Sequence, residues 1–310
     1  MAYSPTLKAE ALNKSLHKMF LDGVESAKKA ISQIMDVVYV TNSDGPSGVY
    51  ILAETLSAFR DRDDSDAMIA DPVTAHEVEV TNARKYRRVH VPLPDLLDDR
   101  IGKYELKTRQ FGRLAVTGPV FDMEKFAEKA ATTICHDGVA LCATNHPRDP
   151  HTSGSPTWSN KLTQAGGLTI DNFGVSLAAM RKFPDADGNP LGSAPTHILV
   201  SADSEGLAMD IAKSRFPSGL QGAENKWLGL GLEVIVVKSW TTDHYMLIDA
   251  SDEVERPFIF QEREPVQMVD ICTDPRSQWA IDKDCLAWAV MGRYGLGVGY
   301  PSKVLLSVKS

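Results

Sequence analysis

Cysteine, histidine and aspartate side chains, the residue types that bind metals or take part in catalysis, occur close together between residues 135 and 151. They are Cys135, His136, Asp137, Cys142, His146 and His151. A structural zinc site usually needs four ligands that include a close Cys-x-x-Cys or His-x-x-x-His pair. Neither pair is present, so we expect no metal. A hydrolase or transferase site built from His136, Asp137 and His146 stays open as an alternative, because spatial pairing can be hidden in a sequence.

Three further segments only partly resemble ligand-binding loops. Residues 44–48 form a Gly/Pro turn without the Lys-Ser/Thr of a phosphate loop. Residues 185–190 begin like a calcium loop, but the glycine is early and Thr196 replaces the twelfth-position glutamate, so we predict a reverse turn. The glycines of residues 295–299 precede Pro301 instead of a helix, which predicts a strand and no dinucleotide site. We therefore expect no cofactor, and the lack of a catalytic motif weighs against an enzyme.

A short basic segment interrupts an acidic chain. It consists of Arg84, Lys85, Tyr86, Arg87 and Arg88. Basic residues around an aromatic ring suit nucleic acid, but 33 basic and 41 acidic residues give a net charge of −8, which disfavours a dedicated nucleic-acid-binding protein. We favour a contact with an acidic surface of another subunit. One candidate for that surface is the acidic run Asp61, Asp63, Asp64 and Asp66.

Composition and length indicate a globular protein. The 310 residues are 43% hydrophobic and 24% charged, which fits one large domain or two smaller ones. Charged residues interrupt the apolar runs near the start, so we expect neither a signal peptide nor a membrane span. Four cysteines are too few for a disulfide scaffold, which indicates folding in a reducing cytoplasm.

A long helix over residues 103–134 is the element around which the others are arranged. Its second half has apolar residues at i, i+3, i+4, i+7 and i+11, from Met123 to Ile134. Gly118-Pro119 predicts a kink or short break, because proline removes a backbone donor and clashes with the preceding turn. Asp122 is then suited to cap the second half.

Other segments alternate between helix and strand. Residues 5–35 predict a surface helix, with a detached arm lying on a neighbour as the alternative. Residues 77–80 and 86–91 predict two strands with too little apolar content for a core of their own, hence a projecting hairpin. Later elements are predicted in the following order: a loop over 145–167, a helix over 168–183, a strand over 195–200, a helix over 201–216, and strands over 232–240, 244–250 and 257–271, the last bent at Pro265.

Four segments, in this order, resemble the Mu-like major head subunit family of bacteriophage capsid proteins, which have the Hong Kong 97 fold. Residues 94–104 resemble the acidic lead into the long helix of the family. Residues 134–138 and 144–147 are similar to its Cys-Tyr-Asp-Gly and Asp-His-Pro pattern, with His136 and Asn145 as departures. Residues 190–200 resemble a turn followed by a strand, and residues 256–265 match the Pro-Leu-Ile-Phe-Gln-Glu-Arg strand. The resemblance covers roughly residues 10–306.

The resemblance implies an α+β capsid subunit. The implied divisions are an N-terminal arm (1–50), an extended loop (51–98, with a hairpin at about 70–97), a peripheral domain (99–195) with the spine helix 103–134, an axial domain (196–256), a returning peripheral strand (257–284) and a closing axial strand (285–310). The implied function is a structural major capsid protein that self-assembles into an icosahedral shell around phage DNA. The family offers no catalytic residue to transfer, and no covalent cross-link is inferred.

The implied partners are other copies of the chain, in hexamers and pentamers. Portal, scaffold or decoration proteins and non-specifically held packaged DNA are also expected, whereas a membrane is not. The protein would be made in the host bacterial cytoplasm and end in the virion capsid. An encapsulin-like nanocompartment shell remains the main alternative, ahead of the hydrolase.

Overall fold

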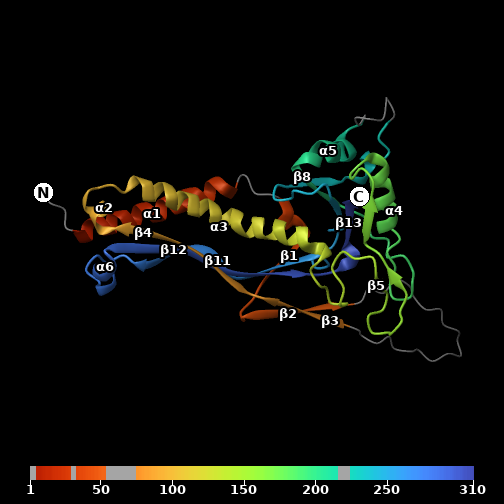
Figure 1. Ribbon diagram of the computed structural model, residues 1–310, viewed down its shortest axis with the longest axis horizontal. Coiled ribbons are helices and arrows are strands. Elements are labelled where there is room, and N and C mark those ends of the chain that lie inside the picture. Colours follow the sequence, from red (N-terminus) through yellow and green to blue (C-terminus); the bar gives the residue numbers. More distant parts are fainter. Residues whose placement is uncertain (1–4, 29–32, 54–74, 216–223) are drawn as a thin grey trace.

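The computed structural model describes residues 5–28, 33–53, 75–215 and 224–310. Its helices are α1 (Pro5–Lys28), α2 (Leu93–Leu97), α3 (Gly102–Glu128), α4 (Ile170–Met180), α5 (Glu205–Lys213) and α6 (Gln278–Lys283). Its strands are β1 (Val38–Asn42), β2 (Ser47–Ala53), β3 (Ala75–Thr81), β4 (Ala83–Pro92), β5 (His146–Pro147), β6 (Thr157–Trp158), β7 (Lys161–Gln164), β8 (His197–Ser201), β9 (Glu233–Val237), β10 (Tyr245–Ile248), β11 (Phe258–Cys272), β12 (Cys285–Val298) and β13 (Val304–Lys309). The molecule is elongated, with a long helix-on-sheet part at one end and a second sheet at the other (Figure 1).

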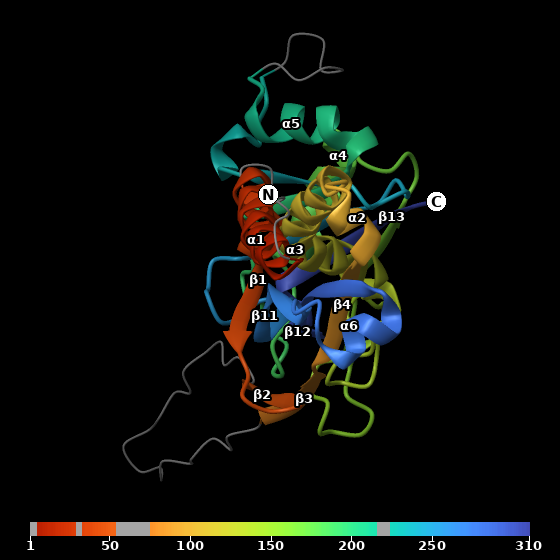
Figure 2. The same ribbon diagram turned by 90° about the vertical axis from the view of Figure 1, so that its left-hand side faces the viewer.

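The long part consists of one sheet covered on one face by two helices. The strand order is β1-β11-β12-β4, in which β1 runs parallel to β11 and the other pairs are antiparallel. Helices α1 and α3 lie side by side on the same face of this sheet (Figures 1 and 2). Trp288 of β12 is fully buried beneath them, with Leu12 and Leu16 of α1 in the same core. Among the described residues, no long helix covers the opposite face of the sheet, where Val80 of β3 lies over β12.

The spine helix α3 continues through Pro119 as one helix, so of the predicted kink or short break the break is wrong. Burial of Val120, Met123 and Ala127 holds the helix in place. Burying each larger apolar side chain contributes about 1.5–3 kcal/mol, which offsets the roughly 3 kcal/mol cost of an internal proline. The predicted cap at Asp122 is also wrong, because its carboxylate accepts a hydrogen bond from the Tyr294 hydroxyl at 2.7 Å instead.

The two ends of the predicted spine helix need different corrections. The α-helix begins at Gly102 and ends at Glu128, and a 3₁₀ turn follows over Lys129–Ala131. Ile134 therefore lies beyond the helix, and it is exposed. The apolar spacing was right for the buried positions but extended too far, because the last turn tightens and the chain then turns back through Gly138, which has a positive φ of 82°.

The N-terminal helix packs on α3 of the same subunit. The two helices run parallel and cross at Gly23 and Gly112, both buried. A Cβ on Gly112 would lie 2.0 Å from the Phe20 carbonyl oxygen, and one on Gly23 would lie 2.2 Å from that of Arg109. Only glycine lets the two backbones approach this closely. In this subunit the helix is thus a packed element and not a detached arm.

The second sheet has the order β7-β13-β10-β8-β9. Helices α4 and α5 cover one face, where Phe173 and Leu177 of α4 are buried as predicted. The other face joins the first sheet through a shared core that includes Leu199 of β8, Phe258 of β11 and Met123 of α3. Residues 285–298 belong to the first sheet, and only β13 of the C-terminal segment enters the second.

The projecting hairpin is formed by β2 and β3, not by β3 and β4 as the sequence suggested. Strand β3 pairs with β2 in the register Ser47↔Thr81 to Ala53↔Ala75, whereas β4 pairs with β12. Asn82 lies between β3 and β4, and its side chain is held by Ser43 and the Gly45 carbonyl. The chain thus passes from the hairpin directly into the long sheet without reversing (Figure 1).

Candidate inter-subunit surfaces and a buried aspartate–histidine pair

The basic segment lies on an edge strand and not at the end of a loop. Its residues belong to β4, where Arg84 pairs with Arg293 and Arg88 pairs with Ala289 of β12. All positions from Ala83 to Arg88 are exposed. An exposed edge strand carrying several positive charges is a common way to prevent uncontrolled strand pairing, and here it also presents charge to the outside of the subunit.

Alternation along β4 divides the basic residues between two faces. Val89 and Val91 are buried under the helices, so odd-numbered positions face α3. Lys85 accordingly lies 3.2 Å from the Asp122 carboxylate of α3. Arg84, Tyr86 and Arg88 face the uncovered side of the sheet, and Arg87 faces the helix side. The structure therefore does not keep the five residues together as one surface.

The acidic run Asp61, Asp63, Asp64 and Asp66 lies outside the described residues. Within the described hairpin, Glu77 and Glu79 are exposed on one face, opposite Ile51 and Val49 of β2. The sequence reasoning missed this face because it did not identify β2 as a strand. The short run of β-branched and aromatic residues Val49-Tyr50-Ile51 after the turn at 44–48 is the signal that would have revealed it.

The hairpin is anchored to the long sheet at its base. Val80 lies over two glycines of β12, such that a Cβ on Gly297 would lie 2.4 Å and one on Gly295 2.7 Å from its methyl groups. The side-chain amide of Gln261 donates to the Val80 carbonyl at 3.2 Å and accepts from the Tyr50 hydroxyl at 2.6 Å. These contacts fix the direction in which the hairpin leaves the body.

Asp137 and His146, both singled out from the sequence, form a buried pair. His146 Nδ1 lies 2.5 Å from the Asp137 carboxylate, and Nε2 lies 3.1 Å from Asn160 Oδ1. The Asn160 amide nitrogen donates to the carbonyls of Leu141 and Pro301, so its oxygen must face the histidine. Each ring nitrogen of His146 thus has a side-chain oxygen within hydrogen-bond distance. Burial raises the pKa of Asp137, but the hydrogen bond and charge of His146 outweigh it and hold that pKa below its usual value.

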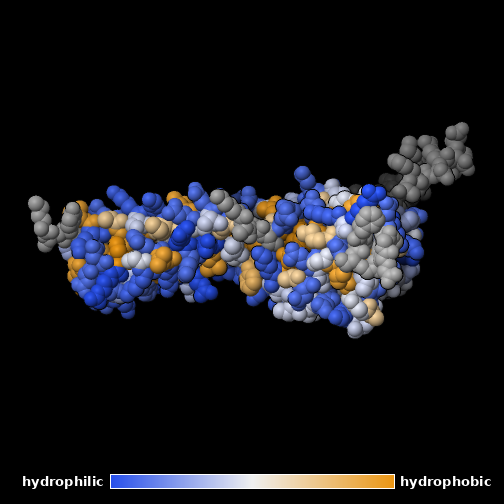
Figure 3. Space-filling model, turned by 90° about the horizontal axis from the view of Figure 1, so that it is seen from above, coloured by the Kyte–Doolittle hydropathy of each residue, from blue (hydrophilic) through white to orange (hydrophobic). Residues whose placement is uncertain are grey.

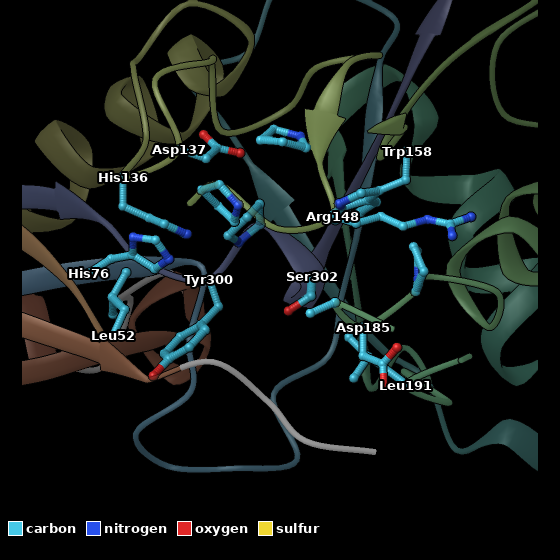
Figure 4. Close-up of a pocket in the computed structure, with 15 residues that line it drawn as sticks. Leu52, His76, His136, Asp137, Arg148, Trp158, Asp185, Leu191, Tyr300 and Ser302 are labelled. Carbon is cyan, nitrogen blue, oxygen red and sulfur yellow. The ribbon is translucent and has the colours of Figure 1, made fainter. Parts of the chain in front are cut away.

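His136 does not join this pair, and its ring lies tilted against His76, which in turn stacks on His151. The ring centre of His76, in β3, lies 4.5 Å from that of His136 and 4.6 Å from that of His151. His76 and His136 border a small pocket of about 90 Å³ that also includes Tyr300 and Asp185 (Figure 4). Among the residues that the structure describes, no group of three His, Cys, Asp or Glu is placed to hold a metal ion.

The residues around the Asp137–His146 pair connect segments of the chain and do not form a reactive site. Burial raises the pKa of the Cys135 thiol to about 12, so it is protonated at neutral pH and is not a nucleophile. His146 has no exposed surface, and its ring stacks on Trp158 with the centres 4.9 Å apart. The pair instead joins the turn after α3 to the segment before β7. In the described part of the chain, no helix has the length and apolar content needed to span a membrane.

Comparisons with known proteins identify the family to which the chain is similar. The family described as "Mu-like prophage major head subunit gpT" matches residues 9–167, 158–241 and 236–309. A comparison with curated proteins gave no match.

Several solved structures have a similar fold. The chain is 18% identical to a protein in the procapsid of bacteriophage JBD30, with a TM-score of 0.56 and coverage of 97% of this chain and 75% of that one. For the capsid of cyanophage P-SCSP1u the identity is 11% and the TM-score 0.55, with coverage of 90% of this chain and 88% of that one. For Mycobacterium phage Bobi the identity is 11% and the TM-score 0.51, with coverage of 90% of both chains. At these identities the likeness establishes the α+β fold of phage capsid proteins, consistent with the Hong Kong 97 type. Because the family match extends over nearly the whole sequence, the chain belongs to the Mu-like major head subunit family.

Proposed function

We infer that this chain is the structural major capsid protein of a phage head and self-assembles into its icosahedral shell. The observation that carries this inference is the family match from residue 9 to residue 309. Negative-stain electron microscopy of the purified protein tests it, and we expect capsomers or closed shells. A stable monomer or dimer with enzymatic turnover would favour the hydrolase, and protein-loaded cages would favour a nanocompartment.

We propose that the two sheets belong to two different domains of the capsid subunit. Helix α1 is the N-terminal arm, the β2–β3 hairpin is the extended loop, and α3 with the long sheet is the peripheral domain. The second sheet, with α4 and α5, is the axial domain that meets its copies at the centre of a capsomer. The separate cores beneath α1 and beneath α4 and α5 support this division.

We also propose that the basic edge strand contacts the hairpin of a neighbouring subunit. Arg84, Tyr86 and Arg88 face the uncovered side of the sheet, and the exposed hairpin face carries Glu77 and Glu79. Complementary charge would set the register of the contact more than its strength. Individually weak contacts suit a shell, because misplaced subunits leave while many simultaneous contacts hold the finished particle.

Charge reversal tests this contact. We expect Arg84→Glu/Arg88→Glu to reduce shell formation strongly while the free energy of unfolding changes by less than about 0.5 kcal/mol, as for other exposed positions. Glu77→Arg/Glu79→Arg should have the same effect alone and should restore assembly when combined with the first pair. Electron microscopy and light scattering measure the yield of shells. Normal shells from either double variant, or no recovery in the combined one, would contradict the proposal.

We propose the remaining partners on more general grounds. Synthesis in the host cytoplasm followed by incorporation into the virion is what a head subunit requires. A net charge of −8 suits a shell that encloses DNA without binding it tightly. Portal, scaffold or decoration proteins are expected to bind surfaces that copies of the subunit leave uncovered.

A further inference from the structure

The fully exposed charged residues of α3 are all basic. They are Lys103, Lys107, Arg109, Arg113 and Lys125, of which Lys103 pairs with Asp95 of α2 at 2.8 Å. The four carboxylates of α3 are less exposed: Glu105 accepts a hydrogen bond from Ser15 of α1, Asp122 accepts one from Tyr294, Glu124 is buried, and Glu128 at the end of the helix is half-buried. In a chain with a net charge of −8 this face of one helix is distinctly basic.

Three large apolar side chains form a ridge among these cations. Leu106, Leu114 and Phe121 are 64%, 41% and 46% exposed. Their spacings of eight and seven residues place them on one side of the helix, about two turns apart, over a length of about 22 Å. Lys125 borders the ridge, with its Nζ 4.4 Å from the centre of the Phe121 ring. Figure 3 views the molecule from this helix side and shows orange patches scattered among blue along its elongated part.

The packing of α3 within the subunit does not account for this ridge. The helix contacts the sheet through Ala115 and Met123 and contacts α1 through Gly112, all on other sides. Single exposed apolar residues are normal on protein surfaces, but three aligned ones flanked by one sign of charge fit a particular kind of partner. The neighbouring α1 differs, because it exposes Glu10 and Glu25 as well as lysines.

We propose that this face of α3 binds an acidic amphipathic helix of a partner protein, laid lengthwise along the ridge. Apolar residues repeating every seven or eight positions would pack between Leu106, Leu114 and Phe121. Acidic residues beside them would pair with Lys107 and Arg113. Duplex DNA would use the cations but gain nothing from the apolar ridge. The binding site is a property of the free subunit and does not depend on the capsid function.

The test uses the full-length, unassembled protein and a synthetic helical peptide of about 21 residues, enough to cover the ridge. The peptide has leucine at the a and d heptad positions, glutamate elsewhere and a fluorescent label, and fluorescence anisotropy measures its affinity. We expect Leu114→Ser/Phe121→Ser to weaken binding at least about tenfold, as expected for the loss of interface anchors. Lys107→Glu/Arg113→Glu should weaken it similarly, and a peptide with lysine in place of glutamate should not bind.

Leu207→Ser is the matched control, since Leu207 of α5 is exposed to nearly the same degree as Leu114. Unchanged affinity in this variant and normal denaturation curves for all variants would show that the losses are local. Three outcomes would overturn the proposal. The first is no binding of the acidic peptide, and the second is an affinity that stays unchanged in Leu114→Ser/Phe121→Ser. The third is displacement of the peptide by duplex DNA that binds the wild-type protein and Leu114→Ser/Phe121→Ser with the same affinity. A fourth is loss of self-assembly in Leu114→Ser/Phe121→Ser without any peptide, which would assign the face to a second copy. Electron microscopy of the wild-type protein tests shell formation separately.

Discussion

Replacing Gly112 with leucine should detach the N-terminal helix from the body of the subunit. A Cβ at this position would lie 2.0 Å from the Phe20 carbonyl oxygen and 3.1 Å from the Gly23 Cα, and both are backbone atoms that cannot rotate away. Overpacking a close contact usually costs 1–3 kcal/mol, and we expect a loss of about 3 kcal/mol because whole helices must separate. Urea denaturation gives the change in the free energy of unfolding.

Hydrogen exchange separates this effect from general unfolding. Amide protection should fall along Pro5–Lys28 and remain in β11 and β12. Gly102→Leu is the matched control: it makes the same substitution at the start of α3, where a Cβ would meet nothing within 4 Å. We expect less than about 0.5 kcal/mol of change there, as for other exposed positions. Full stability and unchanged protection of α1 in Gly112→Leu would show that the two helices are not held together by this crossing.

The sequence was informative wherever one residue pattern decides one element. The spacing of Phe173, Leu177 and Met180 predicted α4, and the alternation over residues 257–271 predicted β11, because burial on one face directly produces these periods. Register shifts on either side of Glu264 also agree with the predicted irregularity near Pro265, where the missing N–H interrupts the ladder.

Pairing between strands was where the sequence reasoning was wrong. Strand β3 has few apolar residues, and its partner was assigned to the nearest later strand. The true partner, β2, precedes it, while β4 pairs with β12 about two hundred residues later. The residue pattern within one strand does not show which distant strand of the sheet it will pair with. The Gly23–Gly112 crossing was hidden for the same reason, since neither glycine has a side chain to form a pattern.

For the site residues too, the sequence indicated the residue types but not their partners. Asp137 and His146 were singled out from the sequence, but nothing in their spacing indicates that Asn160 is the second partner of the histidine. The five basic residues were correctly seen as unusual, yet only the register of β4 against β12 shows that Lys85 faces Asp122 while Arg84 and Arg88 face the other side. Their role in an inter-subunit contact stays a prediction.

Removing His146 should destabilise the subunit more than any exposed substitution. In His146→Ala the Asp137 carboxylate would stay buried without its partner, and breaking one side of a buried pair typically costs 3–5 kcal/mol. His17→Ala is the matched control, because His17 also lies 2.8 Å from an aspartate, Asp270, but both side chains are about 40% exposed. We expect at most about 1 kcal/mol there. Equal losses in the two variants would mean that burial does not govern the Asp137–His146 pair.

The pH dependence of Asp137→Asn provides an independent measure of the same pair. The pKa of Asp137 is lower in the folded protein than its usual value of about 3.9. Its ionised form therefore adds stability that is complete above about pH 5 and is lost as the pH falls through the folded pKa. The wild-type protein should exceed Asp137→Asn in free energy of unfolding at neutral pH, and this difference should shrink below about pH 4. A difference that stays constant down to pH 3 would show that the asparagine acts through shape and not through charge.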